Sequence, residues 1–159
     1  MCSAGVIQNN ALFGAAAPMR YTEPVATLDA DMLVDVPQPD KLGVPSGIYA
    51  FCAARGFAAE GEAVRVGAWP TQFVPVFSPL TREAMDQAET ADFDGVPFRV
   101  VRAVYLAVIA LSVGRAEDFT RILSLLESGS VTRKEIGLLA AQHGLSAAWR
   151  QFETRFPNE

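Results

Sequence analysis

The segment from residue 28 to 36 constrains the fold most, because apolar and acidic side chains alternate along it. One set of alternate positions holds Leu28, Ala30, Met32, Val34 and Val36, and the other set holds Asp29, Asp31, Leu33 and Asp35. A period of two is typical of a β-strand, whose successive side chains point to opposite faces. The segment therefore predicts a strand with one face turned to a core and a row of carboxylates on the other.

Asp29 and Asp31 are the candidate metal ligands of this strand. Two residues apart, they project from one face with their Cα atoms about 6.5 to 7 Å apart. Magnesium prefers one or two carboxylates together with substrate phosphates, and a pair of metal ions can stabilise both reacting oxygens of phosphoryl transfer. The alternative is an acidic strand face that points to water. Asp35 lies about 20 Å along the strand from Asp29, too far to share an ion, and we expect it to be solvated.

The remaining segments predict an α/β (α+β) fold, in which helices flank a mixed sheet and a helical tail follows. A chain of 159 residues is long enough for one compact domain. We expect residues 1–102 to form the α/β core and residues 103–159 to pack on it as a helical part. The predicted strands beyond 28–36 span residues 63–66, 71–77, 90–93 and 96–101. The predicted helices span 6–13, 46–56, 81–88, 103–113, 116–126 and 132–143, with a last one from 146 onwards.

Four of these helices carry recognisable end signals. Ser46, Thr81 and Ser146 are candidate caps, and Thr132 with Glu135 forms a capping box. The stretch from Gly14 to Pro18 is rich in glycine, alanine and proline and should be loop.

Several short motifs follow one another in a fixed order along the chain. Ala4-Gly5 precedes a predicted helix, Arg20-Tyr21-Thr22-Glu23-Pro24 precedes the Asp-x-Asp strand, and residues 69–77 form a later strand. Gly114-Arg115-x-x-Asp118 follows the apolar helix. This order resembles the nucleotidyltransferase (polymerase-beta-like) superfamily, especially its minimal and abortive-infection toxin members, from Ala4 to about Phe156. Arg115 and Asp118 are also spaced to pair across one helical turn.

The resemblance implies Mg²⁺-dependent transfer of a nucleoside monophosphate from a nucleoside triphosphate to a hydroxyl acceptor. The acceptor can be a protein, an RNA or a small molecule. Asp29 and Asp31 would be the catalytic metal ligands. Four further residues would bind the nucleotide, the first two through a turn whose backbone N–H groups meet the triphosphate: Ser3, Gly5, Arg20 and Thr27. The alternatives are that Gly5 only permits a tight turn and that Arg20 only pairs with Glu23.

Three departures from the family pattern support a second hypothesis. Gln72 occupies the place of the family's third carboxylate, and an amide there lacks the charge and the basicity of an acid. The connection from Gly5 to Asp29 is long, and the helix and strand that normally precede the glycine element are missing ahead of Gly5. The chain can therefore also be a catalytically inactive nucleotide- or partner-binding relative. A third hypothesis is a toxin–antitoxin component whose helical tail, 116–156, docks a protein partner.

The composition of the chain excludes several further classes of function. A formal net charge of −5 argues against a strong surface for non-specific nucleic-acid binding, although four arginines fall close together in the sequence: Arg99, Arg102, Arg115 and Arg121. Two cysteines and the single histidine, His143, exclude a disulfide framework and His-rich metal chemistry. We expect His143 to lie in the last turn of a helix, where a positive charge suits the dipole. The longest apolar run, 103–113, is too short to cross a bilayer, which needs about 20 residues, and no secretion signal is visible. We expect a cytoplasmic protein without a membrane segment.

Overall fold

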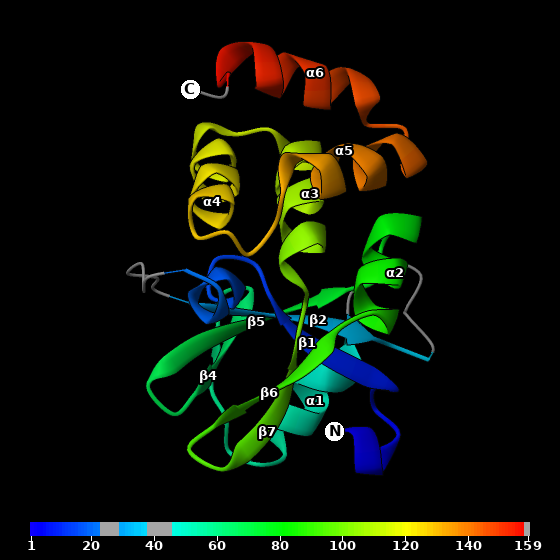
Figure 1. Cartoon of the computed structure of the whole chain (residues 1–159). Helices are drawn as coiled ribbons and strands as arrows, with labels where there is room; N and C mark the ends of the chain where they lie inside the picture. The colour runs from blue at the N-terminus through cyan, green and yellow to red at the C-terminus, as the bar shows by residue number, and fades with distance from the viewer. Residues whose placement is uncertain (23–28, 38–45, 158–159) are drawn as a thin grey trace.

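The computed structural model describes residues 1–22, 29–37 and 46–157 and builds them around one mixed sheet (Figure 1). Seven strands lie in the order β3-β4-β5-β2-β1-β7-β6. Their bounds are β1 Asn9–Phe13, β2 Ala30–Asp35, β3 Ala59–Glu60, β4 Ala63–Val66, β5 Trp69–Pro75, β6 Glu89–Phe93 and β7 Val96–Val100. The prediction of a mixed sheet flanked by helices is confirmed.

Two helical layers cover the two faces of this sheet. The α-helices are α1 Ser46–Ala53, α2 Pro79–Asp86, α3 Ala103–Val113, α4 Ala116–Glu127, α5 Arg133–Gln142 and α6 Ser146–Arg155, and the short 3-10 helices are η1 Cys2–Ala4 and η2 Ala17–Arg20. The helix α1 covers one face through a small cluster around Ile48 and Cys52. The helices α2 to α6 lie on the other face, where the main core joins sheet residues to α3 and the helices beyond it (Figure 1).

The predicted strand over 28–36 corresponds to β2, which is buried on both of its faces. Leu33 belongs to the main core and Val34 to the cluster around α1, and neither side chain is exposed to solvent. The strand lies between β5, which runs parallel to it, and β1, which runs antiparallel. The face that carries Asp31 is therefore covered by the helical layer near Leu33, and only part of this face is open to bulk water.

The predicted helix over residues 6–13 is wrong. Residues 9–13 form β1, which pairs with β2 from Asn9 opposite Asp35 to Phe13 opposite Asp31. On its other side, Leu12 of β1 pairs with Val100 of β7. Strand preference depends on packing partners more than helix preference does, and here both neighbours are distant in sequence.

The ends of the helices match the sequence in part. The capping box of Thr132 and Glu135 is confirmed, with the Glu135 N–H 3.3 Å from Oγ1 of Thr132. The cap predicted at Thr81 is wrong: Ser78 caps α2, and Thr81 completes the capping box from inside the helix. Ser146 is the first helical residue of α6 and not its cap.

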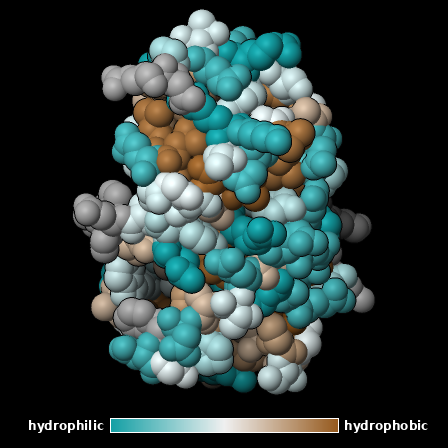
Figure 2. All heavy atoms as spheres, in the orientation of Figure 1, coloured by the Kyte–Doolittle hydropathy of each residue, from teal (hydrophilic) through white to brown (hydrophobic). Residues whose placement is uncertain are grey.

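The helix α3 has the predicted bounds and lies between the sheet and the later helices. Most of its side chains are buried, and it contacts α2, α4, α5 and α6. Figure 2 shows apolar side chains gathered at the surface over the C-terminal helices, where Leu123, Leu126 and Phe156 are only partly buried. No described helix is both long enough and apolar enough to span a bilayer.

Candidate functional site

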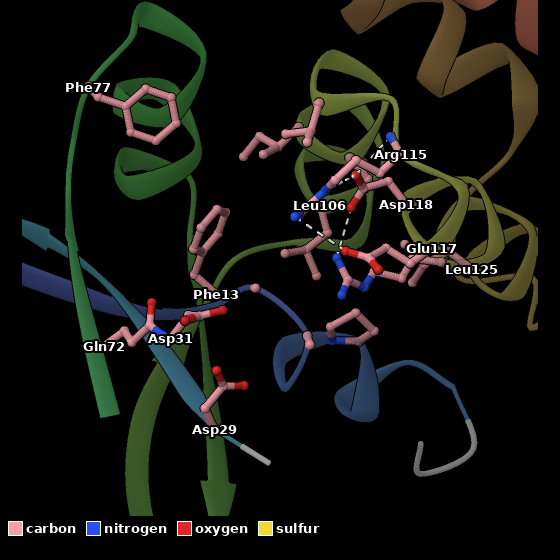
Figure 3. A pocket seen from close by; sticks show the side chains of 17 residues that line it. Phe13, Asp29, Asp31, Gln72, Phe77, Leu106, Arg115, Glu117, Asp118 and Leu125 are labelled. Atoms are coloured by element: carbon pink, nitrogen blue, oxygen red, sulfur yellow. Dashed lines mark hydrogen bonds and ion pairs between the residues drawn. The ribbon is translucent and has the colours of Figure 1, made fainter. Parts of the chain in front are cut away.

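A cleft of about 420 Å³ lies between the sheet and the helices α3 and α4, with walls of different character (Figure 3). The sheet side contributes Phe13, Asp29, Asp31 and Gln72. The helical side contributes four charged residues: Arg115, Glu117, Asp118 and Arg121. The cleft therefore sets a pair of carboxylates opposite a cluster that contains two guanidinium groups.

A glycine turn at the end of β1 packs directly against Asp31. Gly14 has a positive φ of 61°, which favours glycine. A Cβ atom at this position would lie 1.8 Å from Oδ2 of Asp31 and 2.7 Å from its Cβ. The backbone N–H of the next residue, Ala15, acts on the Asp31 carboxylate and lowers its pKa. Glycine is thus required at position 14 both by its backbone conformation and by the close approach of the carboxylate.

The carboxylate of Asp31 is held in an electrostatically unfavourable position. Its burial and, after that, the negative charge of Asp29 raise the pKa of Asp31 above its ordinary value. The Ala15 N–H and the positive charge of Arg121 act in the opposite direction and do not cancel the rise. A cation beside this pair would relieve both unfavourable contributions, because it favours the ionised form of each acid.

Gln72 lies next to Asp31 in the neighbouring strand. The parallel register of β2 and β5 pairs Asp31 with Gln72, and both side chains line the cleft. An amide is neutral, so it offers an oxygen to a cation but no charge. Among the described residues, no three His, Cys, Asp or Glu side chains form a group that could hold a metal ion. The acidic wall therefore has two ionisable groups and one neutral oxygen donor.

On the opposite wall, Asp118 organises both arginines. Its side chain is only 2% exposed. Oδ2 accepts hydrogen bonds from the backbone N–H and from Nε of Arg115, both at 3.1 Å, and Oδ1 accepts one from Nη1 of Arg121 at 2.8 Å. Arg115 and Asp118 thus pair across one helical turn and also line the cleft (Figure 3).

The structure brings Asp29 and Asp31 together but does not bring Ser3 and Gly5 to them. Ser3 belongs to η1 and Gly5 follows it, at the end of β1 that pairs with Asp35. Neither residue lines the cleft. The glycine turn that lies beside the carboxylates is at Gly14. The strand β1 precedes this turn, whereas no strand precedes Gly5 among the described residues.

The two other predicted nucleotide-binding residues are not part of the described cleft wall. Arg20 ends η2, and its guanidinium carbon lies 5.8 Å from the ring centre of Tyr21. Thr27 lies outside the described residues, as does Glu23, the alternative partner of Arg20.

Sequence reasoning missed the glycine turn and Arg121. The signal for the turn was present, because the apolar residues Ala11, Leu12 and Phe13 run directly into Gly14. Interpreting that run as a strand makes the connection to Asp29 shorter than the one counted from Gly5. The role of Arg121 depends on how α4 packs over the sheet, which the sequence does not reveal.

Comparison with known proteins assigns the fold. No protein-family model matches the sequence, and no curated protein matches it. The structure is similar to that of an antigenic nucleotidyltransferase-like protein from Paracoccidioides brasiliensis, with a TM-score of 0.55 and 13% identity over 99% of this chain and 92% of that one. It is also similar to the antibiotic-resistance factor ANT(2'')-Ia, with a TM-score of 0.52 and 14% identity over 97% of this chain and 91% of that one. The chain has a nucleotidyltransferase-like fold.

Proposed function

We propose that this cleft binds a nucleoside triphosphate with Mg²⁺ at Asp29 and Asp31 and transfers the nucleoside monophosphate to a hydroxyl acceptor. The observation that carries the proposal is the contact between Asp31 and the turn at Gly14, beside Asp29, in a cleft of a nucleotidyltransferase-like fold. The similarity to a protein described as nucleotidyltransferase-like supports the substrate class.

The acidic wall fits a magnesium ion. Mg²⁺ commonly takes one or two carboxylates and completes its shell with water and substrate phosphates, so the missing third acid does not exclude it. The raised pKa of Asp31 supports the assignment, because a cation would stabilise the ionised form there. When bound, the ion would neutralise charge on the phosphates and hold them in place.

The residues of the chain have separate tasks in this proposal. Asp29 and Asp31 would hold the ion that orients the phosphates, and the turn at Gly14 would keep the Asp31 carboxylate in place through its close contact. Gln72 cannot take a proton from the acceptor hydroxyl, because an amide is not a base near neutral pH. That single feature favours the second candidate function, a relative that binds the nucleotide without turning it over.

The binding step is tested by titration calorimetry with Mg²⁺ and each of the four nucleoside triphosphates. We expect the double variant Asp29→Asn, Asp31→Asn to lose at least tenfold in affinity, since it removes both charges from the metal site. Asp35→Asn is the matched control, because Asp35 lies on the same strand but pairs with Arg82, 2.8 Å away, outside the cleft. Equal affinity of the double variant and the unaltered chain would remove the metal assignment.

The transfer step is tested with triphosphates labelled at the α-phosphate, offered with the chain itself and with RNA as acceptors. If the third acid limits the reaction, Gln72→Glu should raise the rate of label transfer without abolishing binding. Label transfer by neither form, with binding intact, would favour the non-catalytic relative. The toxin–antitoxin hypothesis stays a prediction, and the size of the purified chain with the neighbouring gene product tests it.

A further inference from the structure

The guanidinium of Arg121 occupies the wall of the cleft that faces the acidic pair. Its side chain is 32% exposed, and Asp118 accepts one hydrogen bond from Nη1. A guanidinium carries five N–H groups, so this bond leaves most of its donor capacity for other partners. Asp31 and Arg121 line the same cleft from its two walls. Both groups can therefore contact one ligand bound there.

Asp118 fixes the direction of this guanidinium. Its carboxylate is almost completely buried and also accepts the backbone N–H of Arg115 at the start of α4. A carboxylate anchored to the backbone in this way cannot follow a moving side chain, so it holds Arg121 in place. We regard Asp118 as a positioning residue.

Arg115 is less suited to binding an anion than Arg121. Its side chain is 62% exposed, and its Nη1 lies 3.3 Å from Glu117 in addition to the bond that Nε makes to Asp118. Two acids therefore share its charge, and water screens it more strongly.

We infer that Arg121 binds the terminal phosphates of the triphosphate from the wall opposite Asp29 and Asp31, an inference that rests on the proposed function. Among the described residues, the charged side chains that line the cleft comprise four acids and two arginines. This lining therefore repels a polyphosphate unless a cation and a well-placed guanidinium offset the acids. Guanidinium and phosphate match in shape and form paired, charge-assisted hydrogen bonds. The acids hold the cation side of the ligand, and Arg121 holds its anionic end.

The test uses inorganic tripolyphosphate with Mg²⁺, because this probe carries the phosphates without a base. Calorimetry should show that Arg121→Gln weakens binding about tenfold or more, as expected for loss of a charge-assisted contact. Arg150→Gln is the matched control, because Arg150 is an exposed arginine of α6 that does not line the cleft. It should bind the probe like the unaltered chain.

The possible outcomes distinguish a failure of this inference from a failure of the proposed function. If Arg121→Gln binds tripolyphosphate normally while the Asp29→Asn, Asp31→Asn variant does not, the inference is overturned and the proposed function stands. If the unaltered chain binds neither tripolyphosphate nor any triphosphate, both fall.

A second measurement avoids any folding defect of the variant. Nitrogen-15 spectra of the unaltered chain should show the Nε–H signal of Arg121, assigned with Arg121→Lys, shifting as tripolyphosphate is added, while the signal of Arg150 stays fixed. A stationary Arg121 signal at saturating probe would contradict the inference.

Discussion

Replacing Gly14 by alanine tests the contact on which the acidic wall depends. Position 14 has a positive φ, and an alanine there costs about 1 to 2 kcal/mol for the backbone conformation alone. The added methyl group also meets Asp31, at 1.8 Å from Oδ2, 2.6 Å from Cγ and 2.7 Å from Cβ. Rotating the carboxylate cannot relieve the last of these contacts, because the Cβ atom is fixed by the backbone of β2.

Gly5→Ala is the matched comparison for this variant. Gly5 also has a positive φ, of 68°, but a Cβ atom there would have no atom of another described residue within 4 Å. It should therefore lose only the conformational term, about 1 to 2 kcal/mol. Gly14→Ala should in addition force the Asp31 side chain out of its place, which costs about 1 to 3 kcal/mol more, for a total of about 2 to 5 kcal/mol.

Urea unfolding measures the difference between these variants. With a slope of about 2 kcal/mol per molar urea, the midpoint of Gly14→Ala should lie about 1 M below that of Gly5→Ala. Gly14→Ala should also weaken binding of Mg²⁺ with tripolyphosphate, and Gly5→Ala should not. Equal midpoints and equal binding would refute the reasoning and return Gly5 to consideration as the functional turn.

Three further predictions concern charged groups. Asp31→Asn should stabilise the metal-free chain at neutral pH by less than about 1 kcal/mol, given partial exposure to solvent. The pKa of Asp31 is raised in the folded chain, so the stability falls as the pH rises from the ordinary aspartate range through the raised value. Thermal unfolding across pH should show this fall in the unaltered chain and not in Asp31→Asn. The hydrogen bond from Arg82 lowers the pKa of Asp35, so the stability from this pair is present above the ordinary aspartate pKa and is lost as the pH falls. Arg82→Gln should remove that loss in acid, and an unchanged dependence of stability on acid pH would contradict this prediction. His143→Ala should cost about 1 kcal/mol in urea unfolding, because Nε2 of His143 lies 2.8 Å from Glu83 and links α5 to α2, and no loss would show that this link is not stabilising.

The sequence predicts best those elements whose signals are local. The bounds 103–113 of α3 follow from an uninterrupted apolar run that ends at Gly114, which adopts a positive φ of 74° at the helix end. The hairpin of β6 and β7 follows from the turn residues Asp94 and Gly95, which both have a positive φ. In each case a few adjacent residues decide the structure.

The strand β1 could not be predicted from adjacent residues, because the strands that pair with it are distant in the sequence. Its two asparagines at positions 9 and 10 favour strands weakly, and its pairing depends on β2 and β7, the latter almost ninety residues further along. Because of this error, the glycine turn expected beside the carboxylates is placed at Gly5, whereas the structure has it at Gly14.

The residues of the candidate site also differ in whether a local pattern predicts them. The spacing of Asp29 and Asp31 predicts two acids on one face, and the structure places both at the cleft. The partners of these acids, the turn at Gly14 and the guanidinium of Arg121, come from segments that only the tertiary fold brings to them. His143 lies at the end of α5 near its expected position, but its bond to Glu83 of α2 has no local signal.

The two walls of the cleft also emerge from the ribosome at different times. The carboxylates and Gln72 belong to the first half of the chain, whereas Arg121 follows only after β7 and α3 have been made. A ligand stabilises only the state that binds it. Whatever occupies this cleft therefore cannot assist the early stages of folding during synthesis, and a chain halted before α4 gains no protection from it.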